Sequence, residues 1–194
     1  AYIFYLTGDH WVVKDLKFST AQKGIMLEGA SNNVIDNIEV SNIGAEAVHF
    51  RYFSSNNSLS NCYIHNTGKR DGQEGFGEAV YVGTHDGHTA EKLDKSDNNR
   101  IGGCSIGPNI TAEAFDIKSG TSGTIIESNY INGKGIIGSS GSPAADSFID
   151  INAVIIGPTV IGRNVTIAPN CTISASDIGD NTTIHANTVI DQTN

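Results

Sequence analysis

Short runs in which apolar and polar residues alternate recur along the chain with nearly the same letters. The segments AEAVHFR (45–51), GEAVYVG (77–83) and AEAFDIK (112–118) keep a glutamate and the apolar positions while the residues between them change. Alternation with a period of two is typical of a β-strand with one buried face. The same pattern is found in YIFYLT (2–7), KGIMLE (23–28) and SFIDIN (147–152). The sequence therefore predicts a first series of six equivalent strands.

A second series of strands follows the first, each after a turn. NNVIDNIEV (32–40), NNSLSNCYI (56–64) and NNRIGGCSI (98–106) all open on a pair of asparagines. Asparagine tolerates the positive φ of a tight corner, so we expect corners at these pairs. HWVVKDLKF (10–18) and TIIESNYI (124–131) complete the series. Two strand series that recur every 21 to 35 residues predict an all-β protein folded as a parallel β-solenoid.

The register of the repeats predicts which residues stack inside the coils. One inward column contains Phe4, Ile25, Val48, Val80, Phe115 and Ile149, and the next contains Leu6, Leu27, Phe50, Val82, Ile117 and Ile151. A further column contains Leu16, Ile38, Cys62, Cys104 and Asn129. Cys62 and Cys104 would then be neighbours about 4.8 Å apart, the spacing of adjacent strands. That spacing permits a disulfide, and two buried thiols that fill space as small apolar residues are the alternative.

The segments AQKGIMLEGASNNVIDNIEV, EAVHFR and GFGEAVYVG resemble right-handed parallel β-helix proteins of the pectate-lyase-like class. More narrowly, they are similar to a group of secreted bacterial and fungal β-helix repeat proteins. The resemblance covers roughly residues 2–152 and implies right-handed coils. It does not carry an activity over, because the calcium-binding Asp cluster and the catalytic Arg motif of the known pectate lyases are not matched here.

The spacing shortens after residue 155. Isoleucines recur at intervals of six with one interval of five, at Ile161, Ile167, Ile173, Ile178, Ile184 and Ile190. This resembles the hexapeptide repeat of left-handed β-helices, some of which are trimeric acyltransferases with a histidine at the subunit interface. Two turns are too few for that active site, so we interpret His185 as structural. We predict coils over 1–154, with loop insertions at 67–77 and 83–99, and further coils or a cap of either hand over 155–194.

The residues between the inward positions of the first series are predicted to point to solvent. One outward column is Tyr5, Met26, His49, Tyr81, Asp116 and Asp150, and beside it stand Lys23, Glu46, Glu78 and Glu113 on one side and Glu28, Arg51 and Lys118 on the other. Carboxylates stacked at the strand spacing raise one another's pKa or call for a cation, unless the lysines and Arg51 balance them. Charged ladders can also serve only to keep a solenoid face soluble.

The two inserted loops flank this face, and loops of this length commonly form the walls of a binding groove. Glu74, His85, Asp86 and His88 could add polar groups to it. The spacing of the HDGH run matches no strong zinc pattern, and a turn is its simpler interpretation.

The first functional hypothesis is an enzyme that acts on an extended polysaccharide bound along this face. In a lyase, His49 or Lys118 would be the base and Tyr81 the acid, and the substrate carboxylate would be neutralised by Arg51 or by Ca²⁺. Glu78, Glu113 and Asp116 would hold that calcium ion. In a glycoside hydrolase, Asp116 and Asp150 would form the acid and base pair. Glu46, Glu78, Glu113, Arg51 and Lys118 are the predicted substrate-binding residues.

The alternative is a non-catalytic solenoid that has a structural role or binds glycan. The first coil begins at residue 2 with no polar cap, which would expose Phe4 and Leu6. This edge could pair with another chain and let copies stack end to end.

Composition limits the classes of partner that the protein is expected to have. The net charge of −9 makes nucleic acid an unexpected partner, and the sequence has no apolar run long enough to span a membrane. The chain opens abruptly, as a trimmed product would, and it contains five glycosylation sequons. We therefore expect a secreted protein whose candidate glycosylation sites are Asn56, Asn109, Asn164, Asn170 and Asn181.

Overall fold

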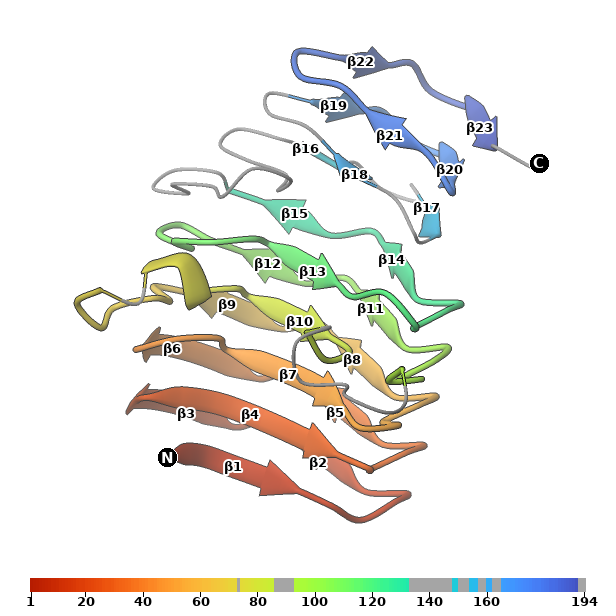
Figure 1. The fold of residues 1–194 in the computed structure, drawn as a ribbon. Coiled ribbons are helices and arrows are strands. Elements are labelled where there is room, and N and C mark those ends of the chain that lie inside the picture. Colours follow the sequence, from red (N-terminus) through yellow and green to blue (C-terminus); the bar gives the residue numbers. More distant parts are fainter. Residues whose placement is uncertain are drawn as a thin grey trace.

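The computed structural model describes residues 1–72, 74–85, 93–132, 148–149, 154–156, 160–161 and 165–191. These residues are almost entirely strand, apart from one short 3-10 helix, η1 (Glu74–Phe76). The strands stack in parallel ladders that climb from the N-terminus to the C-terminus (Figure 1). The predicted fold class, a parallel β-helix, is confirmed.

Each coil of the first part contains three short strands, and not the predicted two. The first sheet consists of β1 (Tyr2–Leu6), β4 (Lys23–Glu28), β7 (Val48–Arg51), β10 (Val80–Val82) and β13 (Phe115–Ile117). The second sheet begins with β2 (Val12–Lys14), β5 (Val34–Asp36), β8 (Ser58–Ser60), β11 (Arg100–Gly102) and β14 (Ile125–Glu127). The third consists of β3 (Lys17–Ala21), β6 (Glu39–Ile43), β9 (Tyr63–His65), β12 (Ser105–Ile106) and β15 (Tyr130–Ile131). The second predicted series splits because a residue with positive φ, such as Asn37 or Asn61, breaks each run at another corner.

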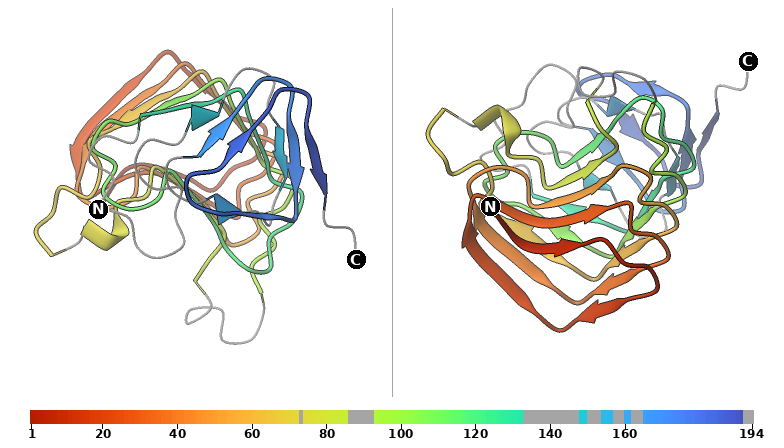
Figure 2. Two further views of the ribbon diagram at one scale, coloured as in Figure 1. Left: turned by 90° about the horizontal axis from the view of Figure 1, so that it is seen from above. Right: turned by 60° about the horizontal axis from the view of Figure 1, so that its bottom comes forward.

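These coils are right-handed. In Figure 1 the first sheet lies in front with its strands directed toward the second sheet, and the third sheet returns behind it while each coil lies above the previous one. Figure 2 shows the same stack from above and from below, with the three sheets as three sides of the coil.

The C-terminal coils wind with the opposite hand. The second sheet continues in one order through β17 (Val154–Ile156), β20 (Thr172–Ser174) and β23 (Val189–Asp191), but β17 is antiparallel to β14 and parallel to β20. Ile126 and Ile173 are both buried and both pair with Ile155, so the interior stays on the same side of the sheet. Because the strand direction reverses while the stacking direction does not, the later coils are left-handed, which the sequence had left open.

The six-residue steps place successive isoleucines on successive strands. Within the described residues, β18 (Val160–Ile161) pairs with β21 (Asp177–Ile178), and β16 (Phe148–Ile149) and β19 (Thr166–Ile167) form a sheet with β22 (Thr183–Ile184). Ile167 pairs with Ile184 and Ile173 with Ile190. The predicted segment 147–152 contains a strand, β16, but its assignment to the first series is wrong, because β16 pairs with β19 and not with β13. Ile151 lies outside the described residues.

The two inward columns of the first series and the corners agree with the predicted register from β1 to β13, whereas Leu16, expected in the further inward column, is 46% exposed. Phe50 pairs with Leu27 and Val82, and all three are fully buried. Leu6, which we expected to be exposed at the end of the stack, is buried at 8%. Burial of such apolar surface contributes roughly 25 cal/mol per Å².

Each of the three asparagine pairs has two different roles. Asn32, Asn56 and Asn98 adopt φ values of 60°, 58° and 57° at the corners, as predicted. The second member of each pair, Asn33, Asn57 or Asn99, is buried instead. The backbone N–H of Asn57 donates to Asn99 Oδ1 at 3.0 Å, and the backbone N–H of Asn33 donates to Asn57 Oδ1 at 2.9 Å. This internal ladder satisfies backbone groups that the corner leaves without a strand partner.

Of the two alternatives for Cys62 and Cys104, the structure has the buried thiols and not the disulfide. All three cysteines lie within the described residues, and all are buried free thiols. The two residues are neighbours as expected, with the Cys62 amide 3.4 Å from Cys104 Sγ. In-register neighbours of a parallel sheet keep their Cβ atoms about 4.8 Å apart, whereas a disulfide needs about 3.8 Å. The thiols act as small apolar fillers.

The sequon asparagines occupy corners of the coils. Asn56, Asn109, Asn170 and Asn181 have φ values of 58°, 61°, 60° and 60°. The corner conformation alone explains asparagine at these positions. Glycosylation stays a prediction, and Asn164 lies outside the described residues.

Candidate functional site

A groove of about 520 Å³ lies over the outer face of the first sheet. Its lining comes from β4, β7, β10 and β13 and from both inserted loops. The lining residues are Lys23, Glu46, His49, Arg51, Tyr52, Gly75, Phe76, Glu78, Tyr81, Thr84, His85, Glu113, Asp116 and Lys118. These include eight of the nine residues predicted for catalysis and substrate binding. The ninth, Asp150, lies outside the described residues.

The outward columns have the predicted register but not the predicted exposure. His49 pairs with Met26 and Tyr81, and Tyr81 pairs with Asp116. Met26 is fully buried, and His49 is only 4% exposed. Of the glutamates, Glu46 and Glu78 are also buried. The expectation that this column points to solvent is wrong for these residues, because neighbouring side chains and the loops cover them.

The first inserted loop is closed at its base. Thr67 Oγ1 donates a hydrogen bond to the Gly77 carbonyl, and Thr111 Oγ1 donates to the Glu74 carbonyl at 2.8 Å. A Cβ atom at Gly77 would lie 2.0 Å from Thr111 Oγ1, so only glycine fits in this neck. The closed neck places Phe76 beside the groove. Glu74, a candidate for the site, does not line it.

A buried aspartate anchors the start of the second loop. Asp94 is 1% exposed and accepts hydrogen bonds from the Tyr52 amide at 2.7 Å, the Phe53 amide at 2.9 Å and Thr84 Oγ1 at 2.6 Å. Tyr52 and Thr84 both line the groove, so Asp94 joins the end of β7 to the loop wall. Nothing in the polar run around Asp94 distinguishes it in the sequence. Of the HDGH run, His85 lines the groove, and Asp86 and His88 lie outside the described residues.

His49 is held by protein groups on both sides of its ring. Nε2 donates to the Gly83 carbonyl at 2.8 Å, and Nδ1 lies 3.4 Å from the Glu46 carboxylate. Glu46 also pairs with Lys23 at 2.5 Å. Burial alone would raise the pKa of Glu46, but the nearby His49 ring and the hydrogen bond from Lys23 outweigh it and lower the pKa to about 2. Glu46 is therefore ionised and fully engaged.

Glu78 is in the opposite electrostatic situation. One carboxyl oxygen of Glu78, one of Glu113 and one of Asp116 lie within 4.8 Å of one another. Burial, followed by the charges of Glu113 and Asp116, raises the pKa of Glu78 to about 8. Such a group either carries a proton at neutral pH or shares a cation with its neighbours.

Two groups suited to proton transfer, Tyr81 and Lys118, lie beside this carboxyl cluster. Lys118 Nζ lies 5.2 Å from the centre of the Tyr81 ring and 2.7 Å from Asp116 Oδ2. Burial and then the charge of Asp116 raise the pKa of Tyr81, so its phenol keeps its proton. Burial raises the pKa of Asp116 as well, against the effect of Lys118. The Tyr81 ring also lies 4.1 Å from the His49 ring.

Arg51 is placed less favourably for substrate. Its guanidinium binds Glu28 Oε2 through Nε at 2.9 Å and through a terminal nitrogen at 2.5 Å. The predicted cation of the site is thus already paired.

Fold and site define a parallel β-helix protein with a covered polar groove on one sheet. The chain is similar to an alginate lyase from Paenibacillus sp. str. FPU-7, with 33% identity and a TM-score of 0.72 over 98% of this chain and 76% of that one. It belongs to the same family of parallel β-helix repeat proteins as that lyase.

The C-terminal coils resemble a second group. Residues 144–175 match the family of bacterial transferase hexapeptide repeats. The bifunctional protein GlmU is 51% identical over 47 residues in Pseudoalteromonas atlantica and 48% identical over 46 residues in Marinobacter nauticus. These stretches cover 24% of this chain, which spans about a tenth of the length of these curated relatives. No helix in the part of the chain that the structure describes is long and apolar enough to cross a membrane.

Proposed function

We propose that the protein is a polysaccharide lyase that cleaves a polyuronate, such as alginate, by β-elimination in the groove over the first sheet. The observation that carries this proposal is that Tyr81 and Lys118 lie together in the groove, beside the carboxyl groups of Glu78, Glu113 and Asp116. The alginate lyase in the same family supports the substrate class.

The reaction needs one base and one acid. The base removes the proton at C5 of the uronate, the electron pair forms the C4–C5 double bond, and the C4–O bond to the neighbouring sugar breaks. The acid then protonates the departing oxygen. We assign Lys118 as the base and Tyr81 as the acid, because the raised pKa of Tyr81 keeps a proton available for the leaving group.

The contacts of Lys118 suit this role better than those of His49. Both ring nitrogens of His49 face protein groups, so we assign it a positioning role beneath Tyr81. Lys118 must lose a proton before it can act as a base. A sugar that enters the groove removes water from around Lys118 and Asp116. The loss of water makes the ionised form of this pair less favourable than the neutral form. Transfer of the proton to Asp116 then leaves a neutral amine.

The substrate carboxylate needs a neutralising partner, and we assign this role to Glu78. A protonated Glu78 can donate a hydrogen bond to the carboxylate as negative charge develops on it. Arg51, the predicted neutraliser, is bound by Glu28.

Calcium could supply the same charge, held by Glu78, Glu113 and Asp116. We favour the proton, because Lys118 lies 2.7 Å from one of these ligands and its ammonium group would repel the ion. Ca²⁺ also takes 6–8 oxygen ligands, and this cluster offers three carboxylates.

The alternatives stay as outcomes of the test. A hydrolase would rely on Asp116, which is paired with Lys118, and on Asp150. A non-catalytic solenoid that binds glycan would use the same groove. We further propose that the protein acts outside the cell, where such polysaccharides occur.

The test is a panel of alginate, polygalacturonate and neutral polysaccharides, each with and without EDTA. Ultraviolet absorbance reports unsaturated uronate ends, and a reducing-end assay reports every cleavage. Absorbance that rises together with reducing ends, unchanged by EDTA, supports the proposal. Reducing ends without absorbance would indicate a hydrolase. If no product forms, the protein is a non-catalytic binding protein. Activity abolished by EDTA would assign the cluster to calcium.

A further inference from the structure

We propose that a second pocket, lined by Gln22, Gly44 and Arg70, binds the carboxylate of another uronate of the same polysaccharide, several sugars away from the point of cleavage. This inference rests on the proposed function and names a remote subsite for its substrate.

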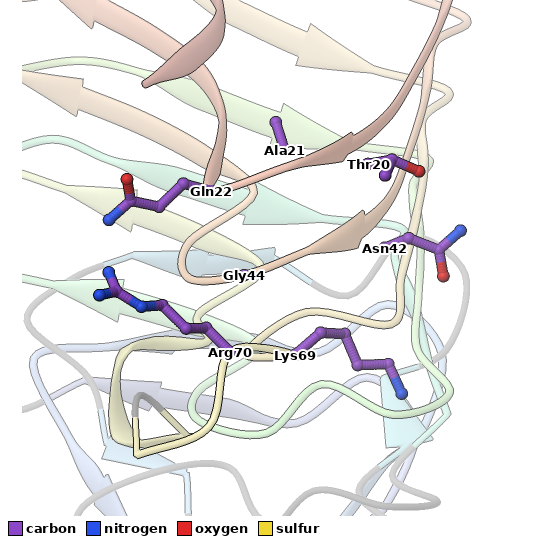
Figure 3. A pocket seen from close by; sticks show the side chains of 7 residues that line it. All are labelled: Thr20, Ala21, Gln22, Asn42, Gly44, Lys69 and Arg70. Carbon is purple, nitrogen blue, oxygen red and sulfur yellow. The ribbon is translucent and has the colours of Figure 1, made fainter.

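The pocket lies at the corner between the third and first sheets. Its volume is about 430 Å³, and it is lined by Thr20, Ala21, Gln22, Asn42, Gly44, Lys69 and Arg70. Figure 3 shows the side chains of Gln22 and Arg70 directed to the same side, with Gly44 between them. Those of Asn42 and Lys69 point to the other side. An amide and a guanidinium that share a side can both donate to one carboxylate.

Arg70 has no carboxylate partner among the residues that the structure describes, and neither has Lys69. Five other cations of the described chain are in ion pairs, namely Lys17, Lys23, Arg51, Arg100 and Lys118. Lys14 and Lys95 are likewise in none of the described ion pairs, but neither has a second cation next to it in the sequence. In a chain with a net charge of −9, two adjacent unpaired cations are a local attraction for an anion.

The backbone holds the cations in place. The amide of Lys69 donates to the Ile43 carbonyl at 3.0 Å, and that of Arg70 donates to the Gly44 carbonyl at 3.2 Å. A Cβ atom at Gly44 would lie 3.2 Å from the Gln22 carbonyl and 3.4 Å from the Arg70 Cβ. Glycine therefore keeps the floor between the two donors open.

Two segments of the chain connect the pocket to the groove. Gln22 lines the pocket, and the next residue, Lys23, lines the groove. The loop 67–77 likewise contributes Arg70 to the pocket and Phe76 to the groove. Gly44 lies five residues before His49, the strand partner of Tyr81, a span of at most about 17 Å of extended chain. The pocket and the groove share no lining residue, so a ligand that occupies both is an extended oligosaccharide.

The test measures equilibrium binding by calorimetry in a Tyr81→Phe background, in which cleavage of the substrate is slowed. We compare a long oligomer of alginate with a disaccharide, for the background protein and after the addition of Arg70→Ala. Lys14→Ala, which removes an exposed cation from the outer face of the second sheet, is the matched control. Arg70→Ala should weaken the long oligomer about tenfold and leave the disaccharide within about twofold, since tenfold corresponds to one charge-assisted contact.

Three results would overturn the subsite. These are an unchanged affinity for the long oligomer, an equal loss for both ligands, or an equal loss with Lys14→Ala. A sulfated polysaccharide without uronates is a further ligand in the test. If Arg70 affects the affinity for this ligand alone, the group bound in the pocket is a sulfate and not a uronate carboxylate. Binding is separate from turnover: a protein that cleaves no polyuronate but loses long-chain affinity with Arg70→Ala would retain the subsite and lose the proposed lyase activity.

Discussion

The outer faces of the first and third sheets contain similar charged ladders in very different surroundings. On the third sheet, Lys17 and Glu39 pair at 2.7 Å, with side chains 80% and 29% exposed. On the first, Lys23 and Glu46 pair at 2.5 Å, but the Glu46 side chain is only 6% exposed. The backbone repeat is the same, but residues of the two inserted loops line the groove over the first sheet, among them Phe76 and Thr84.

Burial under a loop changes how much an ion pair contributes to stability. In water, an ion pair on a ladder is screened and contributes little, whereas the same pair under a loop is expensive unless each charge has a partner. The covered face accordingly contains one carboxyl with a strongly lowered pKa, Glu46, and one with a strongly raised pKa, Glu78. Neighbouring carboxyl groups with pKa values shifted in opposite directions are typical of functional sites.

Substitution of the proton-transfer groups should give the largest difference between the two faces. Lys118→Ala and Tyr81→Phe should each lower the turnover of a polyuronate by about 10²–10⁴-fold, the usual contribution of a general acid or base. Lys17→Ala on the open face should leave turnover unchanged. Initial rates from ultraviolet absorbance measure this, with circular dichroism to confirm folding. Full activity of Lys118→Ala would remove it as the base.

Loss of a carboxylate should destabilise the covered face far more than the open one. Glu46→Gln leaves Lys23 and His49 without their shared partner and should reduce the free energy of unfolding by about 3–5 kcal/mol. Glu39→Gln should cost about 0–1 kcal/mol. Urea unfolding at neutral pH compares the two variants.

The sign of the pH dependence follows from the lowered pKa of Glu46. Its contribution to stability is present above its ordinary value of 4.5 and disappears as the pH falls toward about 2. Two results would contradict this account. One is an equal loss of unfolding free energy in Glu46→Gln and Glu39→Gln, and the other is a Glu46→Gln variant that loses stability in acid as the wild type does.

Glu78 should set the alkaline limit of activity. With a pKa raised to about 8, it is protonated in the folded protein at neutral pH and ionises as the pH rises past that value. Turnover should therefore fall above pH of about 8, and Glu78→Gln, which stays neutral, should shift or abolish this limb. Between 4.5 and about 8 the native state holds a proton that the unfolded chain releases, so this group makes stability decline with pH. A pH profile that Glu78→Gln leaves unaltered would exclude the role.

Much of the fold and most of the site could be predicted from the repeats. The partners of Tyr81 in the first sheet, His49 and Asp116, were read from the register, because in-register stacking follows directly from a period of two and a repeated motif. Their burial could not be read in this way. Neither could the anchoring by Asp94, which depends on a loop that returns to the end of β7.

The sequence by itself determined the parallel coils, the inward columns and the set of polar residues on one face. These are local properties, since alternation and repeat length decide them strand by strand. Only the tertiary structure decided the third strand of each coil, the left-handed winding after β14, the free thiols and the opposite pKa shifts of Glu46 and Glu78. These depend on how strands pair and on what the loops cover, and both are set by contacts between residues far apart in the chain.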